Sequence, residues 1–329
     1  MRQLKRTVKI GNITIGGTNP IAVQTMLNVP VKDIAGNVEQ AKRVAKAGCQ
    51  IVRVTVPTPA DAAVVSAIKE AVDIPVVADI HFDYRAALAA IDAGADKIRI
   101  NPGNIGGLEA TREVIAAAAA AGIPIRIGVN AGSLDDALAA RDDLTLPEKL
   151  AASATEYVRF FEDECDFHDI VVSAKAHDVQ TTIDTYRLLA AELPQVPLHI
   201  GVTEAGTAFQ GIIKSASGLG VLLEEGIGDT LRVSLAADPV EEIKVGFDIL
   251  KDGEGYYPVV RIMSEIAGNS AIMIASEYLN NSRGGKGIVL GGISGITPAE
   301  IVILGAGTLG EFAARTALGL GATVKIFDH

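Results

Sequence analysis

The chain has 329 residues, of which 49% are hydrophobic and only 4% aromatic, and its formal net charge is −11. This length fits one large domain, or one domain followed by a fragment. An acidic balance without a basic stripe argues against nucleic acid as a partner. No apolar run approaches the ~20 residues that span a bilayer, and the N-terminus lacks an apolar signal core. We therefore expect a cytoplasmic protein that does not bind membranes.

The first three quarters of the chain predict a closed barrel. The opening TVKIGNITIGG, with Gly-Asn between two alternating runs, is typical of a β-hairpin that caps the barrel's bottom. Eight short β-branched runs follow as expected strands, at residues 21–26, 51–56, 75–80, 97–101, 124–130, 169–175, 198–204 and 229–235. Alanine-rich amphipathic segments predict helices at 37–47, 84–93, 108–121, 147–162, 179–192, 209–225 and 238–251. This alternation indicates an α/β fold, a (β/α)8 TIM barrel.

Four of the expected strands carry an arginine in the middle, namely Arg53, Arg99, Arg126 and Arg232. A guanidinium keeps its proton, so an arginine inside an apolar strand needs an anion to offset its desolvation. In a chain of net charge −11, this inward positive charge favours a phosphate ester or a diphosphate as the ligand. The alternative is that carboxylates of the same chain neutralise the arginines, with Asp79 pairing with Arg99 and Glu204 with Arg53.

Polar residues are dense in the second halves of the expected strands, where the loops of such barrels build the active site. An interior filled only for packing would hold Val, Ile or Leu there. The candidates are Gln24, Thr25, Arg53, Asp79, His81, Arg99, Asn101, Asn104, Arg126, Asn130, Ser173, Lys175, Thr203, Glu204, Arg232 and Ser234. Lys214 and Ser215, which we expect in the loop after the seventh strand, and the stretches NPGNIGG and GVNAGS add donors suited to phosphate oxygens.

Several strings, in the right order, carry a resemblance to a known family. VADIHFDYR, KIRINPGNIG, RIGVNAGSL, GVTEAGT and GIGDTLRVSLAADPVEE resemble the barrel domain of 4-hydroxy-3-methylbut-2-enyl diphosphate synthase, an oxidoreductase of non-mevalonate isoprenoid biosynthesis. The resemblance covers residues 1–251. It implies that the substrate is 2-C-methyl-D-erythritol 2,4-cyclodiphosphate, whose ring is opened and dehydroxylated by two electrons.

The same resemblance implies roles for individual residues. The diphosphate would be bound by Arg53, Arg99, Arg126 and Lys175, with support from Asn130, Ser234 and Arg232. Residues at the reacting end of the substrate would be Asp79, His81, Asn101 and Glu204.

Members of this family hold a [4Fe-4S] cluster with three cysteines and a glutamate, in a C-terminal module that closes over the barrel of a partner subunit. The resemblance therefore implies a homodimer. This chain has only Cys49 and Cys165, which we expect to be buried, inert thiols, and it has no cysteine after DGEG. We thus expect no metal ligands in this chain, and no reduction unless another polypeptide supplies the cluster.

The remaining residues, 257–329, resemble the central, NAD-binding part of alanine dehydrogenase. A strand at 300–304 leads into GAGTLG, a helix and a strand at 322–327, so that Gly305, Gly307, Gly310 and Asp328 stand where a dinucleotide fingerprint needs them. The alternative is a strand-to-helix turn packed for backbone reasons alone.

One βαβ unit is only part of a dinucleotide-binding domain, so we expect at most weak NAD binding and no dehydrogenase activity. The sequence thus predicts two regions, a substrate-binding barrel at 1–251 and a linker, helix and incomplete nucleotide-binding unit at 252–329, joined as a chimera of two fragments. The functional alternatives are an enzyme of isoprenoid synthesis by descent and a binding module that holds a phosphate ligand without turnover.

Overall fold

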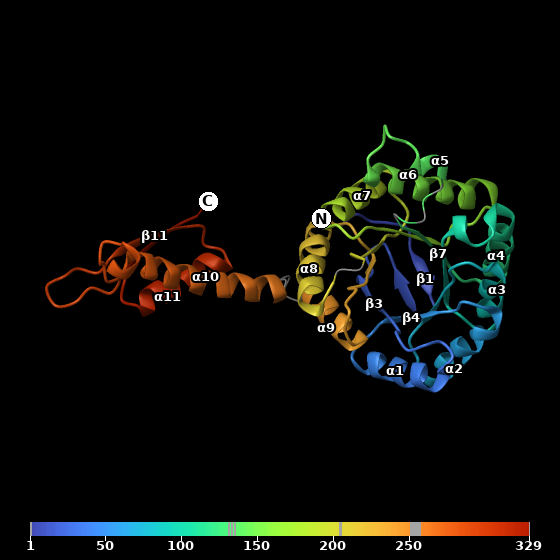
Figure 1. Cartoon of the computed structure of the whole chain (residues 1–329), viewed down its shortest axis with the longest axis horizontal. Coiled ribbons are helices and arrows are strands. Elements are labelled where there is room, and N and C mark those ends of the chain that lie inside the picture. Colours follow the sequence, from blue (N-terminus) through green and yellow to red (C-terminus); the bar gives the residue numbers. More distant parts are fainter. Residues whose placement is uncertain are drawn as a thin grey trace. The chain divides into compact units, whose positions relative to one another are not determined.

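The chain folds into two compact units, Met1–Phe247 and Asp248–His329. The computed structural model describes residues 2–130, 132, 134, 136–203, 206–250 and 258–328. Figure 1 shows the strands of the first unit inside a ring of helices.

The first unit is the predicted barrel. Its sheet runs in the order β8-β7-β6-β5-β4-β3-β10-β9, and every pairing in it is parallel. A parallel bridge between Val172 and Leu198 joins β8 to the segment entering β9 and closes the ring. The strands are β3 (Ala22–Met26), β4 (Ile51–Thr55), β5 (Val76–Asp79), β6 (Lys97–Ile100), β7 (Ile125–Asn130), β8 (Ile170–Lys175), β9 (His199–Ile200) and β10 (Thr230–Leu231). The TIM-barrel prediction is confirmed.

The strands β9 and β10 are much shorter than predicted. Both ladders end near Gly201, where a Cβ would lie 2.6 Å from the carbonyl oxygen of Arg232 and 2.9 Å from Nζ of Lys175. These neighbours leave no space for a side chain at position 201.

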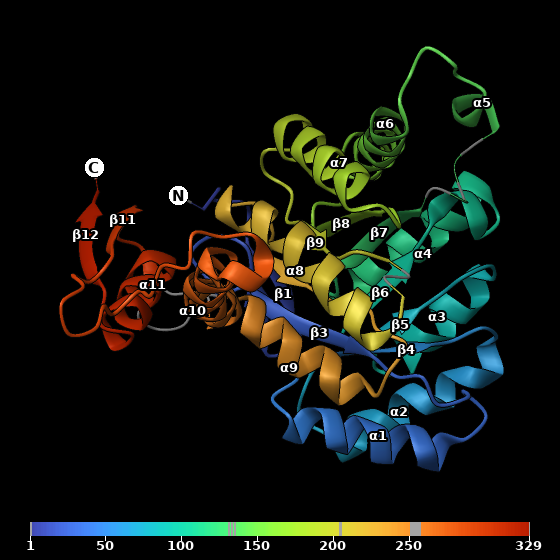
Figure 2. The same ribbon diagram turned by 60° about the vertical axis from the view of Figure 1, so that its left-hand side comes forward.

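Helices cover the outside of the barrel, as the side view in Figure 2 shows. They are α1 (Ile34–Lys46), α2 (Ala63–Ala71), α3 (Tyr84–Asp92), α4 (Gly107–Ala121), α5 (Asp136–Ala139), α6 (Leu146–Arg159), α7 (Val179–Glu192), α8 (Ala208–Glu224) and α9 (Pro239–Ile249). The sequence analysis missed α2, because its β-branched residues Val64, Val65 and Ile68 obscure a short helix. Lys214 and Ser215 lie inside α8, so their assignment to a loop was wrong.

An apolar plug fills the bottom of the barrel. The predicted hairpin is present as β1 (Val8–Ile10) and β2 (Ile13–Ile15), which pair antiparallel. Its side chains form one cluster with the first inward residues of the barrel strands, comprising Val8, Ile10, Ile15, Ala22, Ile51, Val77 and Val171. The polar residues of the interior therefore lie above a sealed apolar layer.

The second unit contains a long helix and one βαβ element. Its parts are α10 (Pro258–Leu279), β11 (Glu300–Leu304), α11 (Thr308–Gly319) and β12 (Thr323–Phe327). The strands β11 and β12 pair in parallel, as the sequence predicted, and Ile272, Leu290 and Ala317 belong to the core beneath them. Of the helices that the structure describes, none combines the length and apolarity needed to cross a membrane.

Candidate active site

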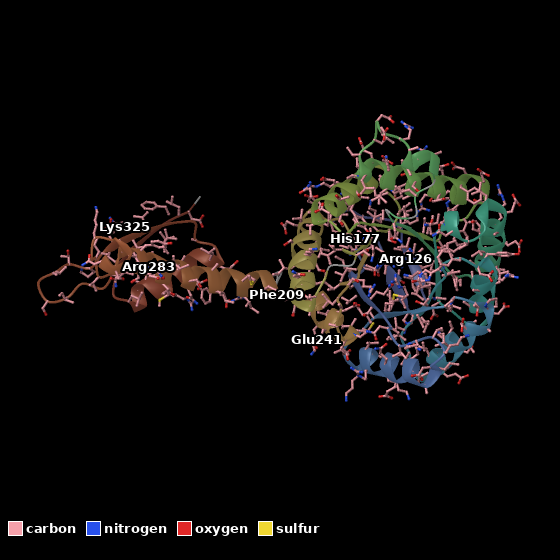
Figure 3. All side chains as sticks on the ribbon, in the orientation of Figure 1. Arg126, His177, Phe209, Glu241, Arg283 and Lys325 are labelled. Carbon is pink, nitrogen blue, oxygen red and sulfur yellow. The ribbon has the colours of Figure 1, made fainter. Side chains whose placement is uncertain are left out.

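Two adjoining cavities open at the carboxyl ends of the barrel strands. The inner cavity has a volume of about 180 Å³ and is lined by Met26, Arg53, Asp79, His81, Arg99, Arg126, Asn130, Ser173, Lys175, Thr203 and Arg232. The outer cavity has a volume of about 350 Å³ and is lined by His81, Phe82, Arg99, Asn101, Asn104, Asn130, Gly132, Lys175, His177 and Thr203. Figure 3 shows Arg126 inside the ring of helices. The cavities share Arg99, Asn130 and Lys175, so they form one continuous site.

Four cations from four strands meet in this site. Arg53 (9% exposed), Arg99 (8%), Arg126 (1%) and Lys175 (9%) come from β4, β6, β7 and β8, respectively. Side chains alternate between the two faces of a strand, which turns these residues inward and their apolar neighbours toward the helices. The structure therefore brings the sequence-predicted cations together.

Asp79 is the carboxylate at the centre of this cluster. Its oxygens lie 3.1 Å from Nη1 of Arg99, 3.6 Å from Nε of Arg53 and 3.3 Å from Nε2 of His81. Burial alone would raise the pKa of the Asp79 carboxyl, but the charges of Arg53 and Arg99 hold this pKa well below its usual value. The expected Arg99–Asp79 pair is thus present, and Arg53 shares the same carboxylate.

Arg126 has no such neutralising partner. Its Nε and Nη1 atoms are buried and make no hydrogen bond within the described ranges. Burial and the nearby Arg53 and Arg99 lower the pKa of this guanidinium well below its usual value. An arginine cannot release its proton under ordinary conditions, so Arg126 remains a charged group in need of an anion.

Arg232 differs from the other cations, because its charge is already matched. Its Nε and Nη2 donate to the two carboxylate oxygens of Glu242, at 3.1 and 2.9 Å. The same carboxylate accepts from Oγ1 of Thr25 at 2.6 Å and from the backbone N–H of Leu235 at 3.0 Å. Thr25 therefore points outward toward α9, and its inclusion among the inward polar residues was wrong. Arg232 still lines the inner cavity, but with a carboxylate of its own chain.

The remaining predicted site residues are arranged as follows. Asn101 lines the outer cavity and accepts a hydrogen bond from the N–H of Gly103 at 3.3 Å. The amide oxygen of Asn130, oriented to satisfy both of its groups, accepts from Nη2 of Arg99 at 3.2 Å. Ser234 is not among the described residues that line the two cavities, and Glu204 lies outside the described residues.

The sequence analysis overlooked Phe82 and His177 at the rim of the outer cavity. His177 follows Lys175 by two residues at the end of β8, so the same strand-end rule could have found it. Phe82 is 76% exposed, and nothing in its local sequence distinguishes it from a surface aromatic residue.

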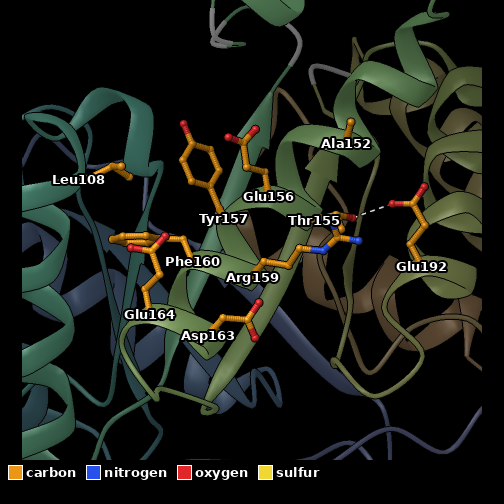
Figure 4. Close-up of a pocket in the computed structure, with 10 residues that line it drawn as sticks. All are labelled: Leu108, Ala152, Thr155, Glu156, Tyr157, Arg159, Phe160, Asp163, Glu164 and Glu192. Carbon is orange, nitrogen blue, oxygen red and sulfur yellow. Dashed lines mark hydrogen bonds between the residues drawn. The ribbon is translucent and has the colours of Figure 1, made fainter.

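A separate, larger pocket lies on the outer surface of the barrel, along α6. Its volume is about 610 Å³, and its lining residues are Leu108, Ala152, Thr155, Glu156, Tyr157, Arg159, Phe160, Asp163, Glu164 and Glu192. Figure 4 shows several carboxylates there, and Thr155 donates to Glu192 at 2.7 Å. This pocket contains none of the predicted site residues and does not provide the cationic surroundings that a diphosphate requires.

Comparison with known proteins agrees with the geometry of the barrel. Residues 5–247 match the family model of the GcpE TIM-barrel domain. The chain belongs to this family. A 4-hydroxy-3-methylbut-2-en-1-yl diphosphate synthase (flavodoxin) of Macrococcus caseolyticus is 50% identical over 250 residues, which are 76% of this chain and 67% of the relative. The protein of the same name from Bacillus anthracis is 50% identical, with 76% and 68% of the two chains covered.

Solved structures that resemble this GcpE-family barrel share its fold. Dihydropteroate synthase from Yersinia pestis superposes with a TM-score of 0.54 at 13% identity, covering 74% of this chain and 97% of that chain. N-acetylneuraminic acid synthetase from Leptospira borgpetersenii gives a TM-score of 0.51 at 12% identity, with 74% and 88% covered. At these identities the likeness concerns the barrel architecture alone.

The cysteines of this GcpE-family chain do not fit an iron-sulfur cluster. Cys49 is buried against β4, where its thiol contacts the carbonyl oxygen of Ile51 at 3.1 Å, and burial raises its pKa to about 12. Cys165 lies beside Arg112, on the outside of the barrel. Across the described ranges, no group of three or more His, Cys, Asp or Glu side chains is placed to hold a metal ion.

The second unit shows the geometry of a fingerprint turn. Residues 271–329 match the family model of the alanine dehydrogenase/PNT C-terminal domain, which confirms the second resemblance. Gly305 has φ +106°, and a Cβ at Gly310 would lie 2.0 Å from the carbonyl oxygen of Gly305. Gly307 precedes α11 as its N-cap. Asp328 accepts a hydrogen bond from the N–H of Ala306 at 3.1 Å, so its carboxylate closes onto the turn itself.

Proposed function

We propose that the barrel binds 2-C-methyl-D-erythritol 2,4-cyclodiphosphate, the substrate implied by the family resemblance. The observation that carries this proposal is Arg126, a buried guanidinium whose Nε and Nη1 have no partner in the described part of the chain. A diphosphate offers oxygens that match the planar fork of a guanidinium. The inner cavity places Arg53, Arg99 and Lys175 around the same space.

In this proposal the cations of the inner cavity neutralise the diphosphate, and the carbon skeleton faces the outer cavity. Asp79 stays ionised because Arg53 and Arg99 flank it, so it fixes these two guanidinium groups in place. Asn130 lines both cavities and supports the diphosphate, whereas Arg232 contributes through its pair with Glu242. Ser234 is assigned a supporting role by the family resemblance alone.

His81, Asn101 and Glu204 are the residues that we assign to the reacting end of the substrate, together with Asp79. His81 lines both cavities and its Nε2 lies 3.3 Å from an Asp79 oxygen. A histidine held by a carboxylate is oriented to hold a proton for a substrate oxygen, which suits departure of a hydroxyl group as water.

We propose further that this chain binds the substrate without reducing it. Its two cysteines are too few and too far apart for the cluster that the family uses. Reduction therefore needs cluster ligands from outside these residues, and the names of the relatives indicate flavodoxin as the electron donor of the assembled enzyme. We also propose that the chain forms a homodimer and is located in the cytoplasm.

Calorimetric titration of the whole chain with the cyclodiphosphate tests the site. We expect binding, and we expect Arg126→Ala to weaken it more than tenfold because a bidentate contact is lost. Arg141→Ala is the control, since Arg141 is exposed and pairs with Asp143. Equal losses in both variants would contradict the site assignment. Anaerobic purification tests the second statement, because brown cluster absorbance from this chain alone would show that its ligands are present after all.

The alternative function is a nucleotide-binding module without turnover, built on Gly305, Gly307, Gly310 and Asp328. The positive φ of Gly305 and the close approach at Gly310 favour it. However, Asp328 bonds Ala306 in the absence of ligand, and two strands form only part of such a domain. We expect weak NAD binding at most, and calorimetric binding of NAD at nanomolar concentrations would reverse the order of the two proposals.

A further inference from the structure

A buried polar layer lies deeper in the barrel than the inner cavity. Lys97 precedes Arg99 by two residues on β6, so strand alternation turns both inward, with Lys97 one layer closer to the apolar plug. Gln24 and His199 are directed into the same interior, and Lys97 and His199 are 0% exposed. Nζ of Lys97, both amide atoms of Gln24 and Nε2 of His199 have no hydrogen-bond partner among the described residues.

Among the described residues, basic side chains outnumber carboxylates in the barrel interior. The basic side chains that face it are Arg53, Lys97, Arg99, Arg126, Lys175 and Arg232. Asp79 forms ion pairs with Arg53 and Arg99, and Glu242 forms an ion pair with Arg232. No carboxylate of the described residues is within ion-pair distance of Lys97. Because arginines cannot release protons, the excess charge can be relieved only at a lysine or by a bound anion.

Lys97 is the lysine whose protonation can change without direct contact with a ligand. Lys175 lines both cavities and would contact a bound anion, whereas Lys97 is absent from their linings. Burial, together with the neighbouring Arg126 and Arg53, holds the pKa of Lys97 well below its usual value. Its protonation therefore responds to any change in the charge of the arginines above it.

We propose that Lys97 is uncharged in the ligand-free barrel and takes up one proton from solvent when a diphosphate binds in the inner cavity. The inference rests on the proposed function, since it requires a diphosphate next to Arg126. The bound anion offsets the positive potential that disfavours an ammonium at Lys97. Nζ gains a proton from solvent, and no other bond changes.

Titratable groups from several elements surround this interior. They are Arg53 on β4, Asp79 on β5, Arg99 on β6, Arg126 on β7, Lys175 on β8, His199 on β9, Arg232 on β10, Tyr186 on α7 and Glu242 on α9, with His81 and His177 in the cavity linings. Burial and nearby cations hold the pKa of His199 well below its usual value, so its ring is uncharged at pH 8. Burial raises the pKa of Tyr186, which also stays neutral there. Among the described groups that are buried in this interior, Lys97 and Lys175 are therefore the ones whose protonation can change at this pH, and His81 and His177 are the same in every protein compared below.

Isothermal titration calorimetry with inorganic pyrophosphate measures this proton. The whole chain is titrated at pH 8 in two buffers of different ionisation enthalpy and equal ionic strength, for the wild type, Lys97→Met and Lys42→Met. Lys42 is exposed on α1, and its replacement by Met is the same substitution at a site away from the barrel interior. We expect the wild type and Lys42→Met to take up about one proton more per bound anion than Lys97→Met. Protons exchanged by pyrophosphate itself are common to all three proteins.

The affinity for pyrophosphate gives a second readout. Between pH 7 and pH 9, uptake of one extra proton makes the affinity of the wild type fall with rising pH more steeply than that of Lys97→Met, by up to about tenfold per pH unit. Equal slopes and equal uptake in the two proteins, with binding retained, would overturn the role of Lys97 and leave the proposed function intact. Absence of pyrophosphate binding to the wild type would instead overturn the proposed function.

Two further measurements keep the test decisive if Lys97→Met does not fold. Lys97→Gln removes the same titration with a shorter polar side chain, and Lys97→Arg replaces it with a permanent charge, so both should lose the extra uptake. If none of these variants folds, proton uptake by the wild type that persists in Lys175→Met would support the inference, and uptake that is lost in Lys175→Met would contradict it.

Discussion

Gly128 on β7 and Arg99 on β6 fit together so closely that a larger residue at position 128 would displace the guanidinium. A Cβ at position 128 would lie 2.3 Å from Nε of Arg99. The Arg99 guanidinium also donates to the carbonyl oxygen of Gly128 at 3.2 Å. The missing side chain therefore lets a guanidinium lie against the neighbouring strand while it bonds Asp79.

Gly128→Ala is expected to displace the Arg99 guanidinium from Asp79 and to reduce pyrophosphate affinity by about tenfold, the equivalent of one lost charge-assisted contact. Calorimetric titration measures this loss. The control is Gly220→Ala, because Gly220 lies on α8 with open space where its Cβ would be. Unchanged affinity in Gly128→Ala would show that Arg99 does not contribute to anion binding.

Asp79→Asn tests the central carboxylate through stability. The pKa of Asp79 in the folded chain lies well below its ordinary value of about 3.9. Its stabilising contribution is therefore complete above that value and is lost as the pH falls through the folded-state pKa. At pH 7 we expect the barrel of Asp79→Asn to be less stable by on the order of 3–5 kcal/mol, because Arg53 and Arg99 lose their buried counter-charge.

Urea unfolding at pH 7 and at pH 3 measures the effect of Asp79→Asn. The difference between the wild type and the variant should shrink at the lower pH. Asp143→Asn is the control, since Asp143 pairs with Arg141 on the surface and should show little change at pH 7. A destabilisation that is the same at both pH values would mean that Asp79 acts by packing instead of by charge.

Glu242→Gln is expected to destabilise the barrel by about 3 kcal/mol, because Arg232, which is only partly exposed, is left charged without its carboxylate. Thermal or urea unfolding measures the change. The neighbouring residue provides a matched control, Glu241→Gln, since Glu241 is exposed and pairs only with Lys244 on the surface among the contacts described. Similar stability in both variants would argue that the Arg232–Glu242 pair has no net effect.

Gly310→Ala is expected to destabilise the second unit. Its Cβ would lie 2.0 Å from the carbonyl oxygen of Gly305, and neither backbone group can move without opening the turn. Hydrogen exchange of the β11 and α11 amides should become faster. In Gly319→Ala, where the Cβ meets open space near the end of α11, exchange should be unchanged or slower. Equal exchange in the two variants would indicate that the turn is not formed in solution.

The barrel could be predicted because its signals are local. Alternation on β6 and β7 and the glycines that end helices, such as Gly122 with φ +65°, are properties of a few neighbouring residues. Strand length was harder to predict. The ends of β9 and β10 lie against residues of other strands, such as Lys175, whose Nζ approaches Gly201.

The cluster around Asp79 could be predicted because its members lie in the middle of the strands or at their carboxyl ends. The pairing of Arg232 with Glu242 could not, since it depends on how α9 returns to the barrel and not on any spacing in the sequence. Lys97 and His199 were overlooked for a different reason. Alternation places Lys97 on the same face as Arg99, but Lys97 is the first residue of its strand, whereas the predicted candidates lie in the second halves of the strands.

The hairpin β1–β2 and the apolar cluster that it forms with the barrel strands close one end of the barrel. Everything that reaches the buried cations must arrive and depart through one mouth. In the proposed function, a diphosphate therefore enters and its product leaves through the same opening. This single route is set by the three-residue strands β1 and β2, which close the opposite end of the barrel.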